Sequence, residues 1–471
     1  MAEVAEVAKA TGEKRHITKT MRTFWGIGEF GESIGTMMGM MYGVFFLTDI
    51  VLVPPALLAV TTMLGSVASF VLTPVAGMII DGTKPMKWGK LRSFVLVFPL
   101  IFLLLSPFSF ISWGHPTVTA LIICFTGMIG GLVYTTMVTA NVSLIPSMCA
   151  YDEEANALTS NRMIYASLGR MFGGYIAPVI IMAAIATLGN SSYLVLHIAF
   201  TLFLFCCYLV IFRLSKGYEG NGAASVKISE ERLTIKDMVT AVRITPEIVP
   251  LMIADITSSL GSFLMPSLVI YMFTYVVEDG AQLGMMAIYN LVVGIVGTLG
   301  AYFSRWMMKV IPDKRYVLYI TYLPIAGFVF LTRFFVGNVF IFIVLVAIMT
   351  FFMWITQPPE TALYYDIAVI AEAKMGKNPI GIFLALAQYA PRVAGIINGI
   401  VLSTLFVSMG YDPTKPITEG IKMGFINAFS LVTCVIPILG WLAMFFFFKV
   451  TPARVAQARE AIAARDAAGN A

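Results

Sequence analysis

The chain carries little charge. Only 12% of its 471 residues are Asp, Glu, Lys or Arg, whereas 59% are hydrophobic. A soluble domain carries about 25% charged residues because its surface must face water. Most of this surface therefore faces something else, and the mean hydropathy of +0.86 agrees. The 31 Lys and Arg residues are scattered among apolar runs, so the net charge of +5 indicates a lipid bilayer rather than a nucleic acid as partner.

Histidine and cysteine are scarce too. Three His and five Cys form no C-x-x-C pair and no Cys/His cluster, so we expect no metal site, no disulfide framework and no cofactor. His16 lies in the N-terminal tail, His115 in a loop and His197 in an apolar run, which makes a nucleophilic triad implausible and indicates that the chain is not an enzyme. The sequence contains no Walker A pattern, which argues against an ATP-driven pump. The segment Met1 to Arg22 lacks the apolar core of a secretory signal.

Long hydrophobic runs are what the sequence has in abundance. A helix needs about 20 apolar residues to cross a bilayer. Runs such as Phe94 to Leu105 lack the alternation of a barrel strand, so the pattern predicts helices. Twelve spans are expected, at 24–48, 54–80, 93–113, 117–144, 162–188, 192–213, 247–276, 283–308, 316–336, 339–364, 379–408 and 421–448.

A polar stretch divides these spans into six and six. We predict a cytoplasmic tail (1–22), a six-helix bundle (23–213), a cytoplasmic linker (214–245), a second six-helix bundle (246–450) and a cytoplasmic tail (451–471). Lys and Arg gather in the tail and the even-numbered connections, which places both termini in the cytoplasm. Two equal halves are typical of a secondary transporter with its site near the midplane. We expect a monomer in a bacterial cytoplasmic (inner) membrane.

The second connection carries a distinctive pattern. Asp81 ends an apolar run, and Lys87, Lys90 and Arg92 follow in a tight Gly-containing loop. This pattern resembles the loop signature of the major facilitator superfamily, in the variant typical of the glycoside-pentoside-hexuronide:cation symporters. Tyr134–Met137 and Tyr365–Lys374 resemble further helices of that family. The resemblance implies an all-α integral membrane fold of two six-helix bundles, alternating access, and gating roles for Asp81, Lys87, Lys90, Arg92 and Asp366.

The chain departs from the family pattern on its second helix. Family members use two acids there for the coupling cation, and the matching positions here are Ser69 and Thr73. Hydroxyls can still be oxygen ligands, so both stay cation-coupling candidates. The sugar-binding acids of the family fall at Ser33 and Val138.

Acidic residues survive on the first helix. Glu29 and Glu32 are spaced i, i+3, so two carboxyls share neighbouring faces and one of them can carry a proton. We predict them as the replacement coupling pair, with H⁺ preferred over Na⁺. In the alternative they lie in the cytoplasmic vestibule and pair with loop cations.

Ionisable and polar groups inside the other spans are candidates for solute contact, because burying them in a membrane is costly. Arg392 is the leading candidate, since a guanidinium matches a carboxylate or paired hydroxyls. Its alternative is a structural ion pair with Asp255 or Asp366, and Arg162 can serve either a gate or the site. The full set is Arg392, Gln388, Arg162, Asn141, Asp255, Glu360, Tyr42 and Trp354.

These features predict symport of a glycoside-like, hexuronide-like or other small polar solute with a cation. Arg162, Arg170 and Arg392 need counter-charges, which suggests a solute that bears a carboxylate. A first alternative is a facilitator or exporter of an amphipathic, lipid-like solute, and a second is a non-transporting membrane receptor on the same scaffold.

Overall fold

The computed structural model describes residues 16–84, 86–149, 151–219, 240, 242–277, 282–376 and 379–469. All regular elements in these ranges are helices. Twelve of them are long and apolar enough to cross a membrane, so the predicted number of spans is confirmed. By contacts the chain divides into two compact units, Met1–Glu231 with Met286–Leu291, and Arg232–Met285 with Val292–Ala471.

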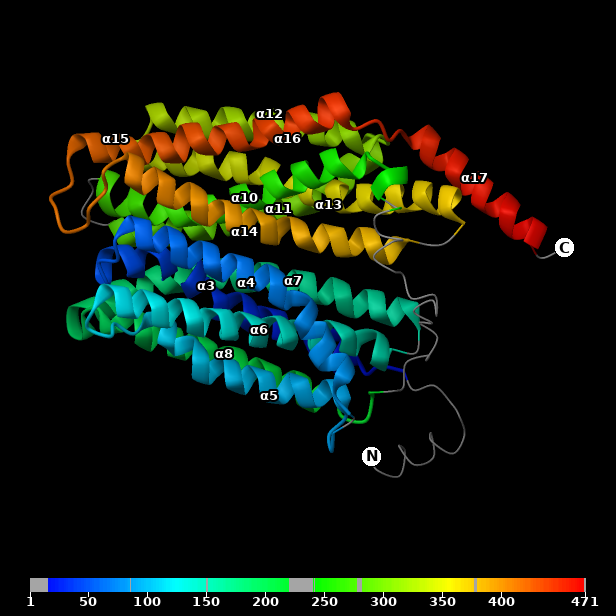
Figure 1. Cartoon of the computed structure of the whole chain (residues 1–471), viewed down its shortest axis with the longest axis horizontal. Coiled ribbons are helices and arrows are strands. Elements are labelled where there is room, and N and C mark those ends of the chain that lie inside the picture. Colours follow the sequence, from blue (N-terminus) through cyan, green and yellow to red (C-terminus); the bar gives the residue numbers. More distant parts are fainter. Residues whose placement is uncertain are drawn as a thin grey trace. The chain divides into compact units, whose positions relative to one another are not determined.

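The helices of the first unit run side by side along the chain's blue-to-green half (Figure 1). A short helix, α2, precedes the first long one, and α3 ends in a five-residue π-helix at Phe46–Ile50. Their bounds are α2 (Lys19–Phe24), α3 (Ile27–Phe45), α4 (Pro55–Gly82), α5 (Lys90–Leu105), α6 (Pro116–Met148), α7 (Asp152–Leu188) and α8 (Ser191–Leu214).

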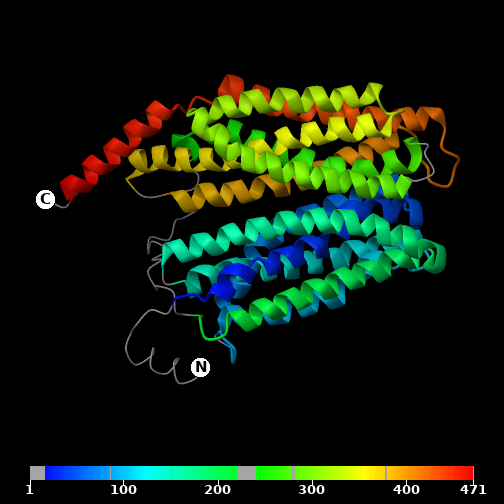
Figure 2. The same cartoon turned by 180° about the vertical axis from the view of Figure 1, so that it is seen from behind.

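Helix α3 packs closely between α7 and α8 (Figure 2). A Cβ atom added at Gly31 would lie 2.7 Å from the Cβ of Cys207 on α8. One added at Gly169 on α7 would lie 2.6 Å from the Phe30 carbonyl oxygen. These glycines let the helices approach nearly backbone to backbone, as small residues do in membrane proteins. The close packing brings the acidic residues of α3 against α7 and α8.

The second unit repeats the plan in the green-to-red half. Helices α10 and α16 pack together, as do α12 and α13, and α10 also contacts α13 and α14. The bounds are α10 (Ile248–Tyr271), α11 (Gln282–Val310), α12 (Lys314–Leu331), α13 (Val339–Met375), α14 (Ile380–Ser408), α15 (Glu419–Asn427), α16 (Thr433–Phe447) and α17 (Pro452–Gly469).

Two spans are longer than the hydropathy pattern predicts. Helix α7 begins at Asp152 rather than at 162, and α13 ends at Met375 rather than at 364. Both extra segments carry charged residues (Asp152, Glu153 and Glu154 in α7; Asp366, Glu372 and Lys374 in α13), which led the hydropathy pattern to exclude them. As a result Arg162 lies almost three turns inside α7 instead of at its beginning.

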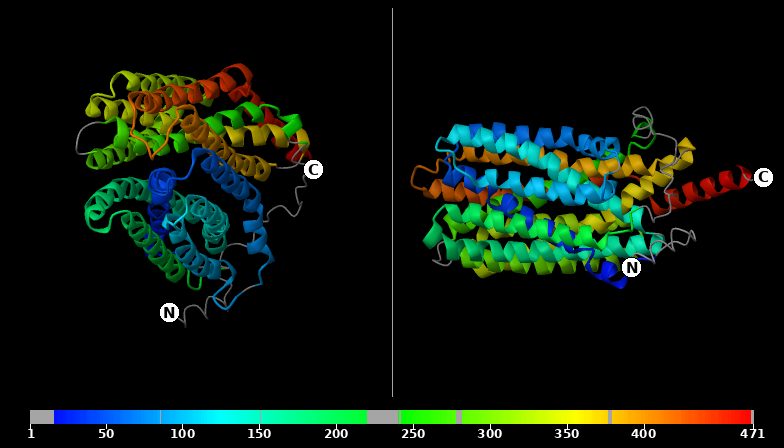
Figure 3. Two further views of the ribbon diagram at one scale, coloured as in Figure 1. Left: turned by 60° about the vertical axis from the view of Figure 1, so that its left-hand side comes forward. Right: turned by 90° about the horizontal axis from the view of Figure 1, so that it is seen from below.

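The C-terminal segment forms a helix that the sequence analysis did not predict. Helix α17 runs on past α16 and contacts α13 (Figures 1 and 3). The Thr451 hydroxyl accepts a hydrogen bond from the Arg454 backbone N–H at 3.2 Å, and Pro452 is the first helical residue. Both are ordinary signals of a helix beginning. Most of the predicted linker (214–245) lies outside the described residues, so the predicted domain boundaries stay predictions.

Candidate functional site

Two carboxyls of α3 are buried in the first unit. Glu32 is 8% exposed; its Oε1 accepts a hydrogen bond from the Tyr134 hydroxyl at 2.6 Å, and its Oε2 accepts one from the Tyr208 hydroxyl at 3.2 Å. These tyrosines come from α6 and α8, so three helices meet at one carboxyl. One hydroxyl hydrogen points to each carboxylate oxygen, and the group is satisfied in its ionised form.

Glu29 is neutralised by an arginine. The Arg162 guanidinium on α7 forms an ion pair with Glu29 and donates to its Oε1 through both Nε and a terminal nitrogen. The Arg170 guanidinium, eight residues further on, interacts electrostatically with Glu29 and Glu32. Two carboxyls and two guanidiniums therefore balance inside this unit. The roles predicted for Arg162, gate or solute contact, stay predictions; in this geometry it is a charge partner of Glu29.

The second unit also holds two carboxyls, on facing helices. Glu360 on α13 is 2% exposed, and its Oε1 accepts hydrogen bonds from the Ser258 hydroxyl at 2.6 Å and the Tyr322 hydroxyl at 2.5 Å. Asp255 on α10 is partly exposed and accepts a 3.0 Å hydrogen bond from Tyr364. Within the described part of the chain, neither carboxyl forms an ion pair with a lysine or arginine. Their partners are neutral hydroxyls.

Arg392 and Gln388 lie one turn apart on α14. Arg392 is half-buried and interacts electrostatically with Tyr389, while Gln388 is exposed. The acids weighed as ion partners for Arg392 have other contacts, since Asp255 bonds to Tyr364 and Asp366 to Lys314. A guanidinium in the middle of an apolar helix is suited to an anionic group.

The remaining candidates for solute contact lie in packed positions. Asn141 on α6 is fully buried, and neither atom of its amide group has a hydrogen-bond partner. Tyr42 on α3 is fully buried with its ring edge-on to Tyr193. Trp354 on α13 is half-buried against Gly297 of α11. Solute contact for these three stays a prediction.

On α4, the hydroxyl candidates bond within their own helix. The Thr73 hydroxyl donates to the Ser69 carbonyl oxygen at 2.7 Å, and Ser69 itself is exposed. Among the described residues, no group of three or more His, Cys, Asp or Glu side chains is placed to hold a metal ion. A cation-coupling role for Ser69 and Thr73 stays a prediction.

The predicted gating loop is anchored through Arg92. This side chain is 8% exposed; it donates to the Ser215 hydroxyl at 3.1 Å and the Phe212 carbonyl at 2.8 Å, both near the end of α8. Glu219 accepts the Leu91 backbone N–H at 2.7 Å and so caps the beginning of α5. The sequence analysis did not predict this role for Glu219, because Glu219 lies just after α8 and 128 residues from Leu91 in the chain. Lys87 is exposed, Lys90 is half-buried, and the side chain of Asp81 lies outside the described part.

Asp366, the other gating candidate, pairs with a lysine. The Lys314 ammonium at the beginning of α12 lies 2.5 Å from the Asp366 carboxylate on α13. In the sequence Lys314 lies in the connection between the predicted spans 283–308 and 316–336, and nothing there indicates its partner. The sequence analysis also missed Tyr208 and Tyr322, because tyrosines in apolar spans are usually packing residues and nothing local marks the two that face a carboxyl.

Comparison with known proteins places this geometry in context. A family model described as "MFS/sugar transport protein" matches residues 24–452. The chain is 22% identical to "Uncharacterized symporter YjmB" of Bacillus subtilis (strain 168), over 97% of both chains. It is also 22% identical to a "Putative sulfoquinovose importer" of Salmonella typhimurium, over 95% of this chain and 93% of that protein.

Solved structures give the same fold at lower identity. A point mutant of the nucleoside transporter NupG matches with a TM-score of 0.65 and 11% identity, over 91% of this chain and 100% of that one. A D-xylose-proton symporter matches with a TM-score of 0.64 and 13% identity, over 93% and 99%. At such identities the likeness establishes the major facilitator architecture.

Proposed function

Because the chain belongs to the MFS/sugar transport family and is an integral membrane transporter, we propose that it carries an acidic sugar together with a proton. Transport would occur by alternating access. The observation that carries the proposal is the pair of carboxyls buried inside membrane-spanning helices and held by hydroxyls, Glu32 in the first unit and Glu360 in the second.

Such carboxyls suit a proton better than Na⁺. A carboxyl surrounded by hydroxyl donors can gain or lose a proton without any change of ligand geometry. A metal cation must separate the oxygens that bind it, whereas here the hydroxyls contact the carboxyl oxygens directly. Glu29 and Glu32 stay the predicted coupling pair, although Glu29 already has a guanidinium partner.

An acidic solute is supported by the arginines within the spans. Arg392 lies half-buried in the apolar helix α14, beside the exposed amide of Gln388. A relative is named as a sulfoquinovose importer, and sulfoquinovose is a sugar with a sulfonate group. A guanidinium recognises a sulfonate or a carboxylate through paired N–H donors. We propose Arg392 as the group that contacts the acidic substituent.

Uptake into proteoliposomes tests the proposal. The solutes are sulfoquinovose, glucuronate and, as a matched neutral control, glucose. An inward proton gradient should drive accumulation of at least one acidic sugar well above that of glucose. Stimulation by a Na⁺ gradient with no response to pH would contradict the proton. Equal transport of all three sugars would contradict the acidic group.

Substitution of Arg392 tests the proposed contact. In detergent, the acidic sugar that is transported should raise the unfolding temperature of the wild type, and Arg392→Gln should abolish that rise. The matched control is Arg305→Gln on α11, an exposed guanidinium outside the candidate site. Binding without any counterflow in the wild type would favour the receptor alternative. Transport of amphipathic solutes alone would favour the facilitator or exporter.

A further inference from the structure

The oxygens around Glu360 form a closed triangle. Glu360 Oε1 lies 2.6 Å from the Ser258 hydroxyl oxygen and 2.5 Å from the Tyr322 hydroxyl oxygen. The two hydroxyl oxygens lie 3.1 Å from each other. All three separations are in or near the range of O–H···O hydrogen bonds. A hydrogen on each side would make the triangle a closed ring of hydrogen bonds.

The hydroxyls alone cannot supply three hydrogens. Ser258 and Tyr322 carry one each. If Glu360 is ionised, two hydrogens serve three sides, and one pair of oxygens faces each other with nothing between them. If Glu360 is protonated on Oε1, it donates to Ser258, Ser258 donates to Tyr322, and Tyr322 donates back to Oε1. Only the protonated form supplies a hydrogen to all three sides of the triangle.

The charge environment of Glu360 favours the same state. Its second oxygen, Oε2, is buried and has no hydrogen-bond partner. The nearest charged group acting on it is another acid, Asp255. A buried carboxylate with a bare oxygen and a negative neighbour is costly, whereas a neutral carboxylic acid in that place is not.

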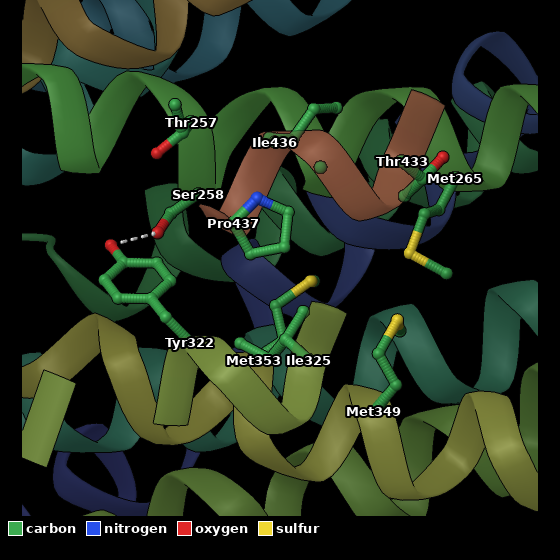
Figure 4. A pocket seen from close by; sticks show the side chains of 11 residues that line it. Thr257, Ser258, Met265, Tyr322, Ile325, Met349, Met353, Thr433, Ile436 and Pro437 are labelled. Carbon is green, nitrogen blue, oxygen red and sulfur yellow. Dashed lines mark hydrogen bonds between the residues drawn. The ribbon is translucent and has the colours of Figure 1, made fainter. Parts of the chain in front are cut away.

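A second acid lies beside the triangle. Asp255 lies one turn before Ser258 on α10, is partly exposed, and bonds to Tyr364, which follows Glu360 by one turn on α13. A cavity of about 20 Å³ borders Ser258 and Tyr322 (Figure 4). Its volume is about that of one water, and most of its lining is apolar, including the flexible methionines Met265, Met349 and Met353.

The corresponding carboxyl of the first unit has different hydroxyl and charged partners, although an acid, Glu29, acts on it as Asp255 acts on Glu360. Glu32 receives one hydroxyl hydrogen on each of its oxygens, so two contacts are served by two hydrogens. Arg162 and Arg170 interact electrostatically with it or with Glu29. Glu32 is thus complete while ionised.

We propose that Glu360 is the residue that binds the coupling proton, and that Asp255 is the group through which the proton arrives. The step is an acid–base exchange in which an O–H bond forms on Glu360 Oε1 as one breaks on a hydronium ion, or on a water or carboxyl that passes the proton on. The reverse step occurs on the side of release. This inference rests on the proposed proton symport.

Infrared spectroscopy of the purified protein tests the site without knowledge of the solute. A titrating carbonyl band of a protonated carboxylic acid should be present in the wild type, absent in Glu360→Gln, and retained in Glu32→Gln and in Asp412→Asn, an acid of the loop after α14. Absence of any such band in the wild type would overturn the inference even if the variants failed to fold. So would its persistence in Glu360→Gln.

Transport separates the two proposals. With the solute found by the uptake screen, Glu360→Gln should keep counterflow within about twofold of the wild type and lose all accumulation driven by a pH gradient, because glutamine mimics the protonated acid. Glu360→Asp should regain part of that accumulation. A wild type that ignores the pH gradient would refute the proposed proton symport itself. If the pH gradient drives accumulation equally in the wild type and in Glu360→Gln, only the role of Glu360 is refuted. The same holds if Glu360→Gln loses counterflow while its thermal unfolding is unchanged.

Discussion

The two units differ in the partners of their acidic side chains. Each unit holds a pair of acids inside its membrane-spanning helices. In the first, Glu29 pairs with Arg162, and Arg170 adds a second positive charge. In the second, Asp255 and Glu360 face serine and tyrosine hydroxyls only. Balanced charges lock helices together at constant ionisation, whereas hydroxyls leave a carboxyl able to change its charge. This difference is the basis on which we propose Glu360, rather than an acid of the first unit, as the group that exchanges the proton.

The largest expected effect is a difference in stability between removing Glu29, which pairs with an arginine, and removing Glu360, which is held by hydroxyls. Glu29→Gln leaves Arg162 buried without its carboxylate and should lower the free energy of unfolding by about 3 kcal/mol. Glu360→Gln should lower it by less than about 1 kcal/mol, since an amide replaces a neutral acid of the same shape. Thermal or denaturant unfolding in detergent measures both. Equal losses would break the contrast between the units.

A double variant checks that the first effect is ionic. Glu29→Gln combined with Arg162→Gln should recover most of the stability lost in the single variant, because no uncompensated charge remains. Additive losses would mean that the two side chains matter for packing rather than for charge.

The tyrosines give the next effect. Tyr322→Phe removes a hydroxyl that contacts Glu360, Ser258 and the Ala254 carbonyl oxygen. It should cost about 1–2 kcal/mol of unfolding free energy. Tyr208→Phe removes one 3.2 Å hydrogen bond to Glu32, so it should cost about 0.5–1 kcal/mol. The reverse order, measured in the same unfolding assay, would contradict the proposed triangle.

In the second unit, the ion pair between Lys314 and Asp366 is more exposed than the pair between Arg162 and Glu29. It should therefore contribute less to the free energy of unfolding. Lys314→Met breaks the pair with Asp366, whose side chains are 28% and 12% exposed. The expected loss is about 0.5–1 kcal/mol and should shrink in high salt. Lys415→Met, on a loop where the lysine is 74% exposed, is the control with no measurable loss. A salt-independent loss as large as that of Glu29→Gln would place a buried ion pair in the second unit after all.

The smallest effect concerns α17. Burial by itself would raise the pKa of Glu247, but hydrogen bonds from its own backbone N–H and from Arg454 on α17, at 2.8 Å, outweigh burial and hold the pKa below its usual 4.5. The ionised carboxylate therefore stabilises the docked helix above pH 4.5, and this contribution is lost as the pH falls through the lowered pKa. The protection of α17 amides, measured as their exchange rate relative to the intrinsic rate at the same pH, should fall slightly at acid pH in the wild type. Arg454→Gln should remove most of that pH dependence; an unchanged pH profile would rule out the ion pair as its cause.

Much of the fold could be predicted because a bilayer makes simple demands. Apolar length alone predicted twelve spans, and the structure has them. The errors lie where helices leave the apolar zone. The first ten residues of α7 are mostly polar, the last eleven of α13 include three charged residues, and α17 follows a short Thr–Pro signal rather than a hydrophobic run. Hydropathy predicts the part of a helix that lies in lipid, whereas these helices continue beyond that part.

The candidate site was predictable only by residue type. Glu29, Glu32, Asp255, Glu360 and the arginines stood out because a charge inside an apolar span is expensive. Their partners did not. Tyr208 lies 176 residues from Glu32 in the chain, and Tyr322 resembles many other tyrosines of apolar helices.

The sequence by itself determined that this chain spans a membrane twelve times and buries ionisable groups, because both follow from composition along single helices. Only the tertiary structure decided which carboxyl meets a guanidinium and which meets hydroxyls. That choice depends on how helices distant in the chain pack side by side, and it separates a fixed charge from one that can take up a proton.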